Sequence, residues 1–214
     1  DVSRYVPVDL NGHVLRSDGN NIVFWIGNGG YLELNDSDPE STHSDFSVKG
    51  GIITGGKVPA MGGGGFAGGV VVNAGGRFTM NGGTIMGCSS PFNGARDAGA
   101  VYVYNGGIFT MKGGTIRDCS AGGLLGAGGV FNEGTMYAEG GTIQDCSGSA
   151  GVVNEGTIDA SYNAERTVFL TSVSGGGTIK ASAKCQVTFL TLYGSTDGTR
   201  RVLRGQAVSR PADP

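Results

Sequence analysis

The sequence predicts an all-β protein, a right-handed parallel β-helix in which three parallel sheets form a solenoid. Three observations support this fold class: a compound motif recurs every 27 to 32 residues, apolar residues alternate within it, and glycine is abundant. Repetition at such a period is typical of proteins built from stacked coils. Alternation with a period of two indicates strands, and a glycine pair in every copy disfavours α-helices.

The clearest repeat is Phe-Thr-Met-x-Gly-Gly-Thr-Ile. It occurs at 78–85 and 109–116, with a variant at 136–143, a degenerate copy at 46–53 and a fragment at 176–179. Stacking the copies in register buries each large apolar side chain, which contributes about 1.5–3 kcal/mol. The expected inward columns are Phe46, Phe78, Phe109 and Met136; Val48, Met80, Met111 and Ala138; and Ile53, Ile85, Ile116 and Ile143.

A second element precedes each copy and predicts another strand that ends in a corner. It consists of valine, an apolar residue and asparagine. Stacked asparagine amides can hydrogen-bond along a column, and asparagine tolerates the left-handed backbone of a corner, so we interpret this column as structural. The expected columns are Val71, Val103, Val130 and Val152, and Asn73, Asn105, Asn132 and Asn154.

The composition excludes several classes of protein. The chain has 43 glycines among 214 residues but only 6 prolines, which excludes collagen. A hydrophobic fraction of 38% and a net charge of −3 disfavour a disordered chain. The charge provides no electrostatic footprint for nucleic acid, and no apolar run approaches the ~20 residues of a membrane span. We therefore expect neither a nucleic-acid partner nor a membrane span.

The repeat pattern predicts a single β-helix domain over residues 1–208. Within it, residues 1–45 are expected to form an N-terminal coil and cap, and residues 46–160 the regular repeats. Residues 161–208 are expected to form irregular coils or a C-terminal cap, and residues 209–214 read as a linker or tail.

Three of the four cysteines form a column of their own. Cys88, Cys119 and Cys146 each lie three residues after the isoleucine of a repeat, whereas Cys185 lies outside the pattern. We expect a ladder of small, buried, free thiols. A disulfide between adjacent coils is the alternative, because their Cα atoms lie within bridging distance. Zinc is not expected, since the usual CxxC spacing is absent.

The compound motif, together with the segment DLNGHVL at 9–15, resembles repeats of large bacterial surface proteins, especially those of Gram-positive gut and oral bacteria. The resemblance covers roughly residues 8 to 180. It implies a pectate-lyase-like solenoid, an extracellular or cell-surface location and an adhesin-type role within a larger surface protein. No catalytic motif accompanies the repeat, so no catalytic residue is inferred from the resemblance.

Four carboxylates are candidates for a metal site. Glu133 and Glu155 occupy equivalent positions in neighbouring coils, as do Asp118 and Asp145 beside Arg117. Stacked like charges are mildly destabilising unless a cation or an arginine relieves them. The alternatives are solvated surface carboxylates, a Ca²⁺ site or a catalytic pair, because Ca²⁺ prefers carboxylate oxygens and glycoside hydrolysis uses two carboxylates. No other cofactor is expected.

Aromatic residues are the candidates for binding. Tyr102, Tyr104, Phe131 and Tyr137 include outward positions by strand parity. If exposed, they could stack on sugar rings or contact a protein; alternatively, the loops fold back and cover them. The favoured function is a non-enzymatic, adhesin-like module that binds a glycan or a host or cell-surface protein, or that acts as a spacer. The alternative is a polysaccharide lyase or glycoside hydrolase of the pectate-lyase-like type.

Overall fold

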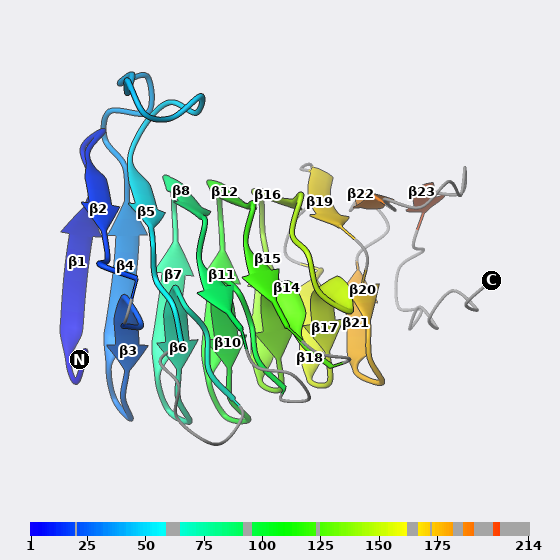
Figure 1. Ribbon diagram of the computed structural model, residues 1–214. Coiled ribbons are helices and arrows are strands. Elements are labelled where there is room, and N and C mark those ends of the chain that lie inside the picture. The colour runs from blue at the N-terminus through cyan, green and yellow to red at the C-terminus, as the bar shows by residue number, and fades with distance from the viewer. Residues whose placement is uncertain are drawn as a thin grey trace.

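The described part of the chain is all-β and contains three long sheets of parallel strands stacked along one axis (Figure 1). This arrangement is consistent with a parallel β-helix. The computed structural model describes residues 1–19, 21–58, 65–91, 96–122, 125–161, 167–171, 173–181, 186–190 and 199–201. Cys185 and the predicted tail at 209–214 lie outside these residues.

Each pass of the chain, here called a coil, contributes one strand to each sheet in the order A, B, C. Sheet A consists of β3 (Phe24–Ile26), β6 (Val70–Val72), β10 (Val101–Val103), β14 (Ala127–Asn132), β17 (Ala150–Asn154) and β20 (Val173–Ser174). Sheet B consists of β1 (Tyr5–Asp9), β4 (Tyr31–Asn35), β7 (Arg77–Met80), β11 (Ile108–Met111), β15 (Thr135–Ala138), β18 (Thr157–Ala160) and β21 (Thr178–Ala181).

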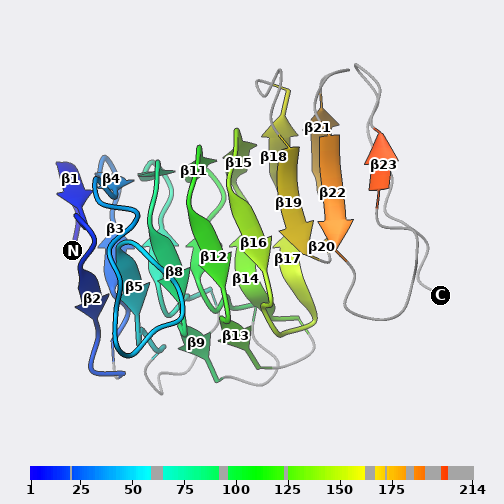
Figure 2. The same ribbon diagram turned by 90° about the horizontal axis from the view of Figure 1, so that it is seen from above.

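Sheet C ends in an antiparallel pair, β22 with β23. Its strands are β2 (Val14–Arg16), β5 (Ile52–Thr54), β8 (Thr84–Met86), β12 (Thr115–Arg117), β16 (Thr142–Gln144), β19 (Thr167–Thr171), β22 (Gln186–Leu190) and β23 (Thr199–Arg201). Two short strands, β9 (Ser89–Ser90) and β13 (Ser120–Ala121), pair beyond β8 and β12 (Figure 2).

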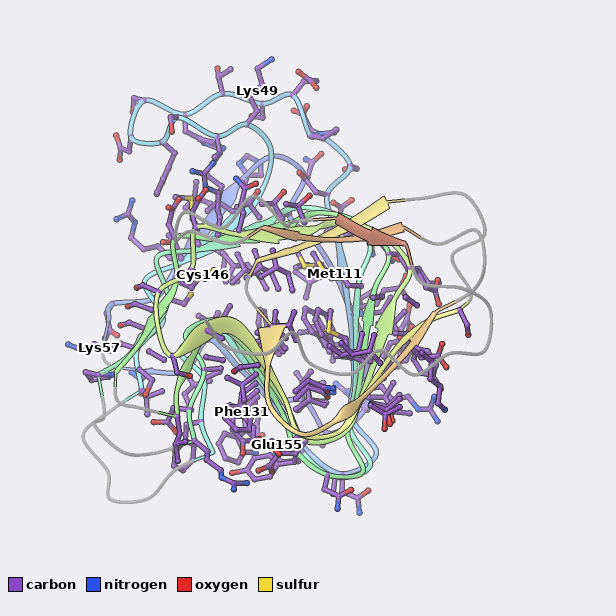
Figure 3. The ribbon with its side chains drawn as sticks, turned by 90° about the vertical axis from the view of Figure 1, so that its right-hand side faces the viewer. Lys49, Lys57, Met111, Phe131, Cys146 and Glu155 are labelled. Atoms are coloured by element: carbon purple, nitrogen blue, oxygen red, sulfur yellow. The ribbon has the colours of Figure 1, made fainter. Side chains whose placement is uncertain are left out.

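The Phe-Thr-Met repeat stacks in the predicted register. Phe78, Phe109 and Met136 are paired neighbours in sheet B, and the isoleucine column of sheet C is equally continuous. These residues are buried in one hydrophobic core that the three sheets share. Figure 3, seen along the stack, shows Met111 among the side chains that fill this interior.

The coil that contains β4 corrects the predicted columns. Leu32 and Leu34, not Phe46 and Val48, pair with Phe78 and Met80. The prediction failed because a long segment, residues 36–51, separates β4 from β5, and the degenerate copy at 46–53 begins inside this segment. This segment lies over β2 and β5 and carries Lys49 away from the sheets (Figures 2 and 3). Within it, the Phe46 ring packs edge-on against His43 instead of entering the core.

The valine and asparagine columns are also corrected. Val70, Val101, Val130 and Val152 pair with one another, so Val71 and Val103 belong to other columns. The error arises at the corner that follows. Eight positions separate Val101 from Phe109, but only six separate Val130 from Met136. Because this corner is shorter in the later coils, Asn132 and Asn154 are the last residues of their strands, β14 and β17.

The predicted amide ladder therefore exists in two coils. Asn132 Nδ2 donates to Asn154 Oδ1 over 2.8 Å, and both side chains are buried. Asn73 instead donates to the carbonyl of Ile26. Because Val103 precedes Asn132 in the column, the buried Asn132 Oδ1 has no hydrogen-bond partner within the described structure.

Glycine is required where two coils approach closely, as at Gly99. A β-carbon there would lie 2.2 Å from the Gly128 carbonyl oxygen and 2.6 Å from the Ser120 amide nitrogen. Both atoms belong to the backbone, Gly128 within strand β14 and Ser120 with its amide bonded to the Cys88 carbonyl, so neither can move away without disturbing the stack. We expect Gly99→Ala to lower the free energy of unfolding by about 1–3 kcal/mol, measured by urea denaturation.

Gly82 provides the matched control for this prediction. A β-carbon at Gly82 would meet its nearest neighbour, Asp36, at 3.5 Å, which is an ordinary contact. Gly82→Ala should therefore change stability by no more than about 0.5 kcal/mol. Equal losses in the two variants would show that close approach of the coils is not what requires glycine at position 99.

Candidate binding faces

The outer face of sheet A is covered, and it holds two of the predicted binding residues. Tyr102 and Phe131 are only 2% and 1% exposed. Their rings stack on neighbouring coils with centroids 5.2 Å apart and planes inclined by 12°. They belong to a second hydrophobic cluster outside the main core, which also includes Val71 and Val153. Of the two alternatives for these aromatic residues, coverage holds for Tyr102 and Phe131.

The covering segment, residues 65–67, packs on this face and is held by a buried carboxylate, Asp97. Phe66 packs against Trp25, with ring centroids 5.9 Å apart, and Gly65 lies against the Tyr104 hydroxyl group. Asp97 Oδ1 accepts hydrogen bonds from the Gly65 and Phe66 amides at 2.8 and 3.0 Å. Asp97 Oδ2 accepts a third hydrogen bond, of 2.6 Å, from the buried Ser90 hydroxyl. Asp97 therefore links the covering segment to strand β9.

Glu133 interacts both with the tyrosines of the covered face and with an exposed arginine. Its carboxylate lies 3.5 Å from Arg96, whose side chain is largely exposed. Burial is the main cause of the raised pKa of Tyr102, and the charge and hydrogen bonding of Glu133 raise it further. The pKa of Tyr104 is also raised by burial and by the carboxylates of Glu133 and Asp97. At neutral pH both phenols thus remain protonated hydrogen-bond donors.

The four candidate metal-binding carboxylates lie in two separate places. Glu133 and Glu155 directly follow the paired Asn132 and Asn154 at the end of sheet A. Glu155 is exposed, and Figure 3 shows it on the outer side of the coil. Glu133 already pairs with Arg96.

Asp118 and Asp145 lie beyond sheet C and share one arginine. Arg117 Nε lies 2.6 Å from the carboxylate of Asp118, and Arg117 Nη2 lies 3.8 Å from that of Asp145. An arginine thus relieves the repulsion between these stacked acids. Within the described ranges, no group of three or more His, Cys, Asp or Glu side chains is arranged to hold a metal ion.

The outer face of sheet B is open except at β7, where the outward Thr79 is buried. Along β4, β11, β15 and β18, buried residues alternate with partly exposed ones, whereas the central strands of sheet A are buried throughout. The register places the outward residues in two columns. These are Tyr5, Tyr31, Arg77, Ile108, Thr135, Thr157 and Thr178, and Pro7, Glu33, Thr79, Thr110, Tyr137, Asp159 and Lys180.

The strongest feature of this open face is an ordered pair of tyrosines. The Tyr5 and Tyr31 rings lie 5.1 Å apart, and the Tyr5 hydroxyl donates to Glu33 Oε2 over 2.7 Å. Tyr5 is 54% exposed. The predicted residue Tyr137 lies on the same face, opposite Thr110. Tyr5 and Tyr31 are not among the predicted binding residues, although the alternation in Tyr31-Leu32-Glu33-Leu34 is the signal that identifies their face.

No protein-family model, curated protein or solved structure matches this chain. In the described part of the chain, no helix has the length and apolarity needed to cross a membrane. The candidate sites of this chain are therefore defined by their own geometry. Among them, the open face of sheet B has the most accessible aromatic residue, Tyr5.

Proposed function

We propose that the chain is a right-handed parallel β-helix that serves as a non-enzymatic, extracellular, adhesin-like module of a larger surface protein. In this proposal the open face of sheet B binds an extended glycan. The observation that carries the proposal is the Tyr5–Tyr31 pair on a partly exposed sheet face. The motif that resembles repeats of bacterial surface proteins supports the same location and role.

The chemistry of the face favours a glycan as the ligand. Tyrosine rings bind the apolar faces of sugars, while hydroxyl and amide groups bond to sugar hydroxyls. The outward columns supply both, with rings at Tyr5, Tyr31 and Tyr137 and hydroxyls at Thr135 and Thr157. The hydrogen bond to Glu33 fixes the Tyr5 ring before a ligand arrives, which reduces the entropy lost on binding. Because neighbouring coils lie about 4.8 Å apart, successive sugars of a chain that runs along the axis would meet the side chains of successive coils.

Binding should depend on the two tyrosines. We expect Tyr5→Ala and Tyr31→Ala each to weaken binding to a responsive oligosaccharide roughly tenfold, as truncating an aromatic binding residue typically does. The measurement is isothermal titration calorimetry, after a panel of neutral and acidic polysaccharides has been screened by co-elution on size-exclusion chromatography.

Leu125→Ala is the matched control. Leu125 is 51% exposed, close to the value for Tyr5, but it lies in the loop between β13 and β14. If Leu125→Ala weakens binding as much as Tyr5→Ala, the open face is not the site. If no polysaccharide co-elutes while a cell-surface protein binds this face, the partner is a protein. Shortening of a polysaccharide would support the lyase or hydrolase alternative, tested next with Glu133→Gln and Glu155→Gln.

A further inference from the structure

Three free thiols are stacked on consecutive coils, and the proposed binding function does not involve them. Cys88, Cys119 and Cys146 are all buried and unbridged, as the sequence predicts. Their register is fixed on both sides. Two residues earlier, Met86 pairs with Arg117 and Arg117 with Gln144; one residue later, the serines at 89, 120 and 147 pair in the same order. Each sulfur therefore lies directly above or below the next.

The spacing of the coils allows only neighbouring cysteines to bond. Parallel strands lie about 4.8 Å apart, which falls within the 4.4–6.8 Å separation of Cα atoms in disulfides. Cys88 and Cys146 are two coils apart, at about twice that distance, and cannot bond without movement of the backbone. Cys119 is therefore the one member of this column that can pair with either of the other two.

We propose that these three residues form an oxidation site, at which a hydroperoxide converts Cys119 and one neighbouring cysteine into a disulfide between coils. A flanking thiolate attacks the peroxide and becomes a sulfenic acid, and the other peroxide oxygen leaves as water or an alcohol. Cys119 sulfur then displaces the sulfenic oxygen, which takes up the Cys119 thiol proton and leaves as water, and the S–S bond forms. Two thiols lose one hydrogen each, the peroxide is reduced, and the third thiol remains.

The contacts between the thiols favour this order of events. Hydrogen bonding to Cys119 lowers the pKa of both Cys88 and Cys146, which increases their thiolate fraction. The pKa of Cys119 is well above its usual value because of hydrogen bonding to Cys146 and Cys88 and because of burial. Cys146 is 4% exposed and lies between the exposed Asp145 and Ser147, so it is the most accessible point of attack.

The test exposes folded protein to hydrogen peroxide in a Cys185→Ser background. Thiols are then counted in denaturant, and linked peptides are identified by mass spectrometry. We expect two of the three thiols to be lost with a mass decrease of two hydrogens, and cross-links only of 88 with 119 or of 119 with 146. Cys88→Ser and Cys146→Ser should each still form one bridge, whereas Cys119→Ser should form none.

A bridge between Cys88 and Cys146 in folded protein, or bridging in Cys119→Ser at the parent rate, would overturn the proposal. So would the absence of any bridge in the parent protein. The selectivity of the parent protein is informative even if Cys119→Ser does not fold. Oxidation of the unfolded parent should yield the 88–146 link as well, which would show that the fold imposes the selectivity.

Discussion

Replacing Phe109 by alanine is expected to lower the free energy of unfolding by about 3–5 kcal/mol, because it leaves a cavity in the shared core. Phe109 is fully buried, and its ring stacks on Phe78 with centroids 5.0 Å apart and planes inclined by 8°. It also pairs with Met136 on the next coil, so its loss removes contacts in both directions along the stack. Urea denaturation, monitored by circular dichroism, measures the change.

Thr110→Ala is the control for this substitution. Thr110 follows Phe109 on the same strand but faces outward, where it is partly exposed. Its replacement should cost less than about 1 kcal/mol, the span of strand propensity. If the two variants lose the same stability, the column does not form the core. A change in the denaturant slope for Phe109→Ala would instead show that the coils unfold separately, as in other repeat proteins.

The sheet B and sheet C columns could be predicted because local sequence determines them. Phe78, Phe109 and Met136 stand at the same distance from their glycine pairs, so aligning the motif aligns the coils. Where the length of a connection changes, this reasoning fails. The segment inserted before Gly50 displaced Phe46, and the shorter corner after Asn132 shifted the valines by one or two positions.

The exposure of the candidate site could not be predicted from strand parity. Parity places Tyr102 and Tyr137 on outward faces, but it does not reveal that one face is covered and the other open. Coverage depends on Phe66 and Asp97, which lie in loops without periodic partners and meet only in three dimensions. The ion pair of Glu133 could not be predicted either, because its partner Arg96 lies a whole coil earlier in the sequence.

Because Asp97 holds the covering segment, its removal should both destabilise the protein and uncover sheet A. Asp97→Ala leaves the Phe66 amide and the Ser90 hydroxyl without their acceptor, whereas the Gly65 amide keeps its hydrogen bond to the Arg96 carbonyl. Buried donors that lose a partner cost about 1–3 kcal/mol each, so we expect the two together to lower the free energy of unfolding by about 2–6 kcal/mol. The protein's single tryptophan, Trp25, packs on Phe66, so its fluorescence should shift to longer wavelength as water reaches the ring.

Asp97→Asn separates the effect of the hydrogen bonds from that of the charge. Its amide oxygen can still accept from both backbone amides while its NH₂ group donates to the Ser90 oxygen, so we expect a smaller loss of about 1–2 kcal/mol and no fluorescence shift. If both variants lose the same stability and both shift the Trp25 emission, the charge of Asp97 holds the segment. If neither variant shifts the emission, the segment covers sheet A without Asp97, and the closure of that face rests on the packing of Phe66 against Trp25.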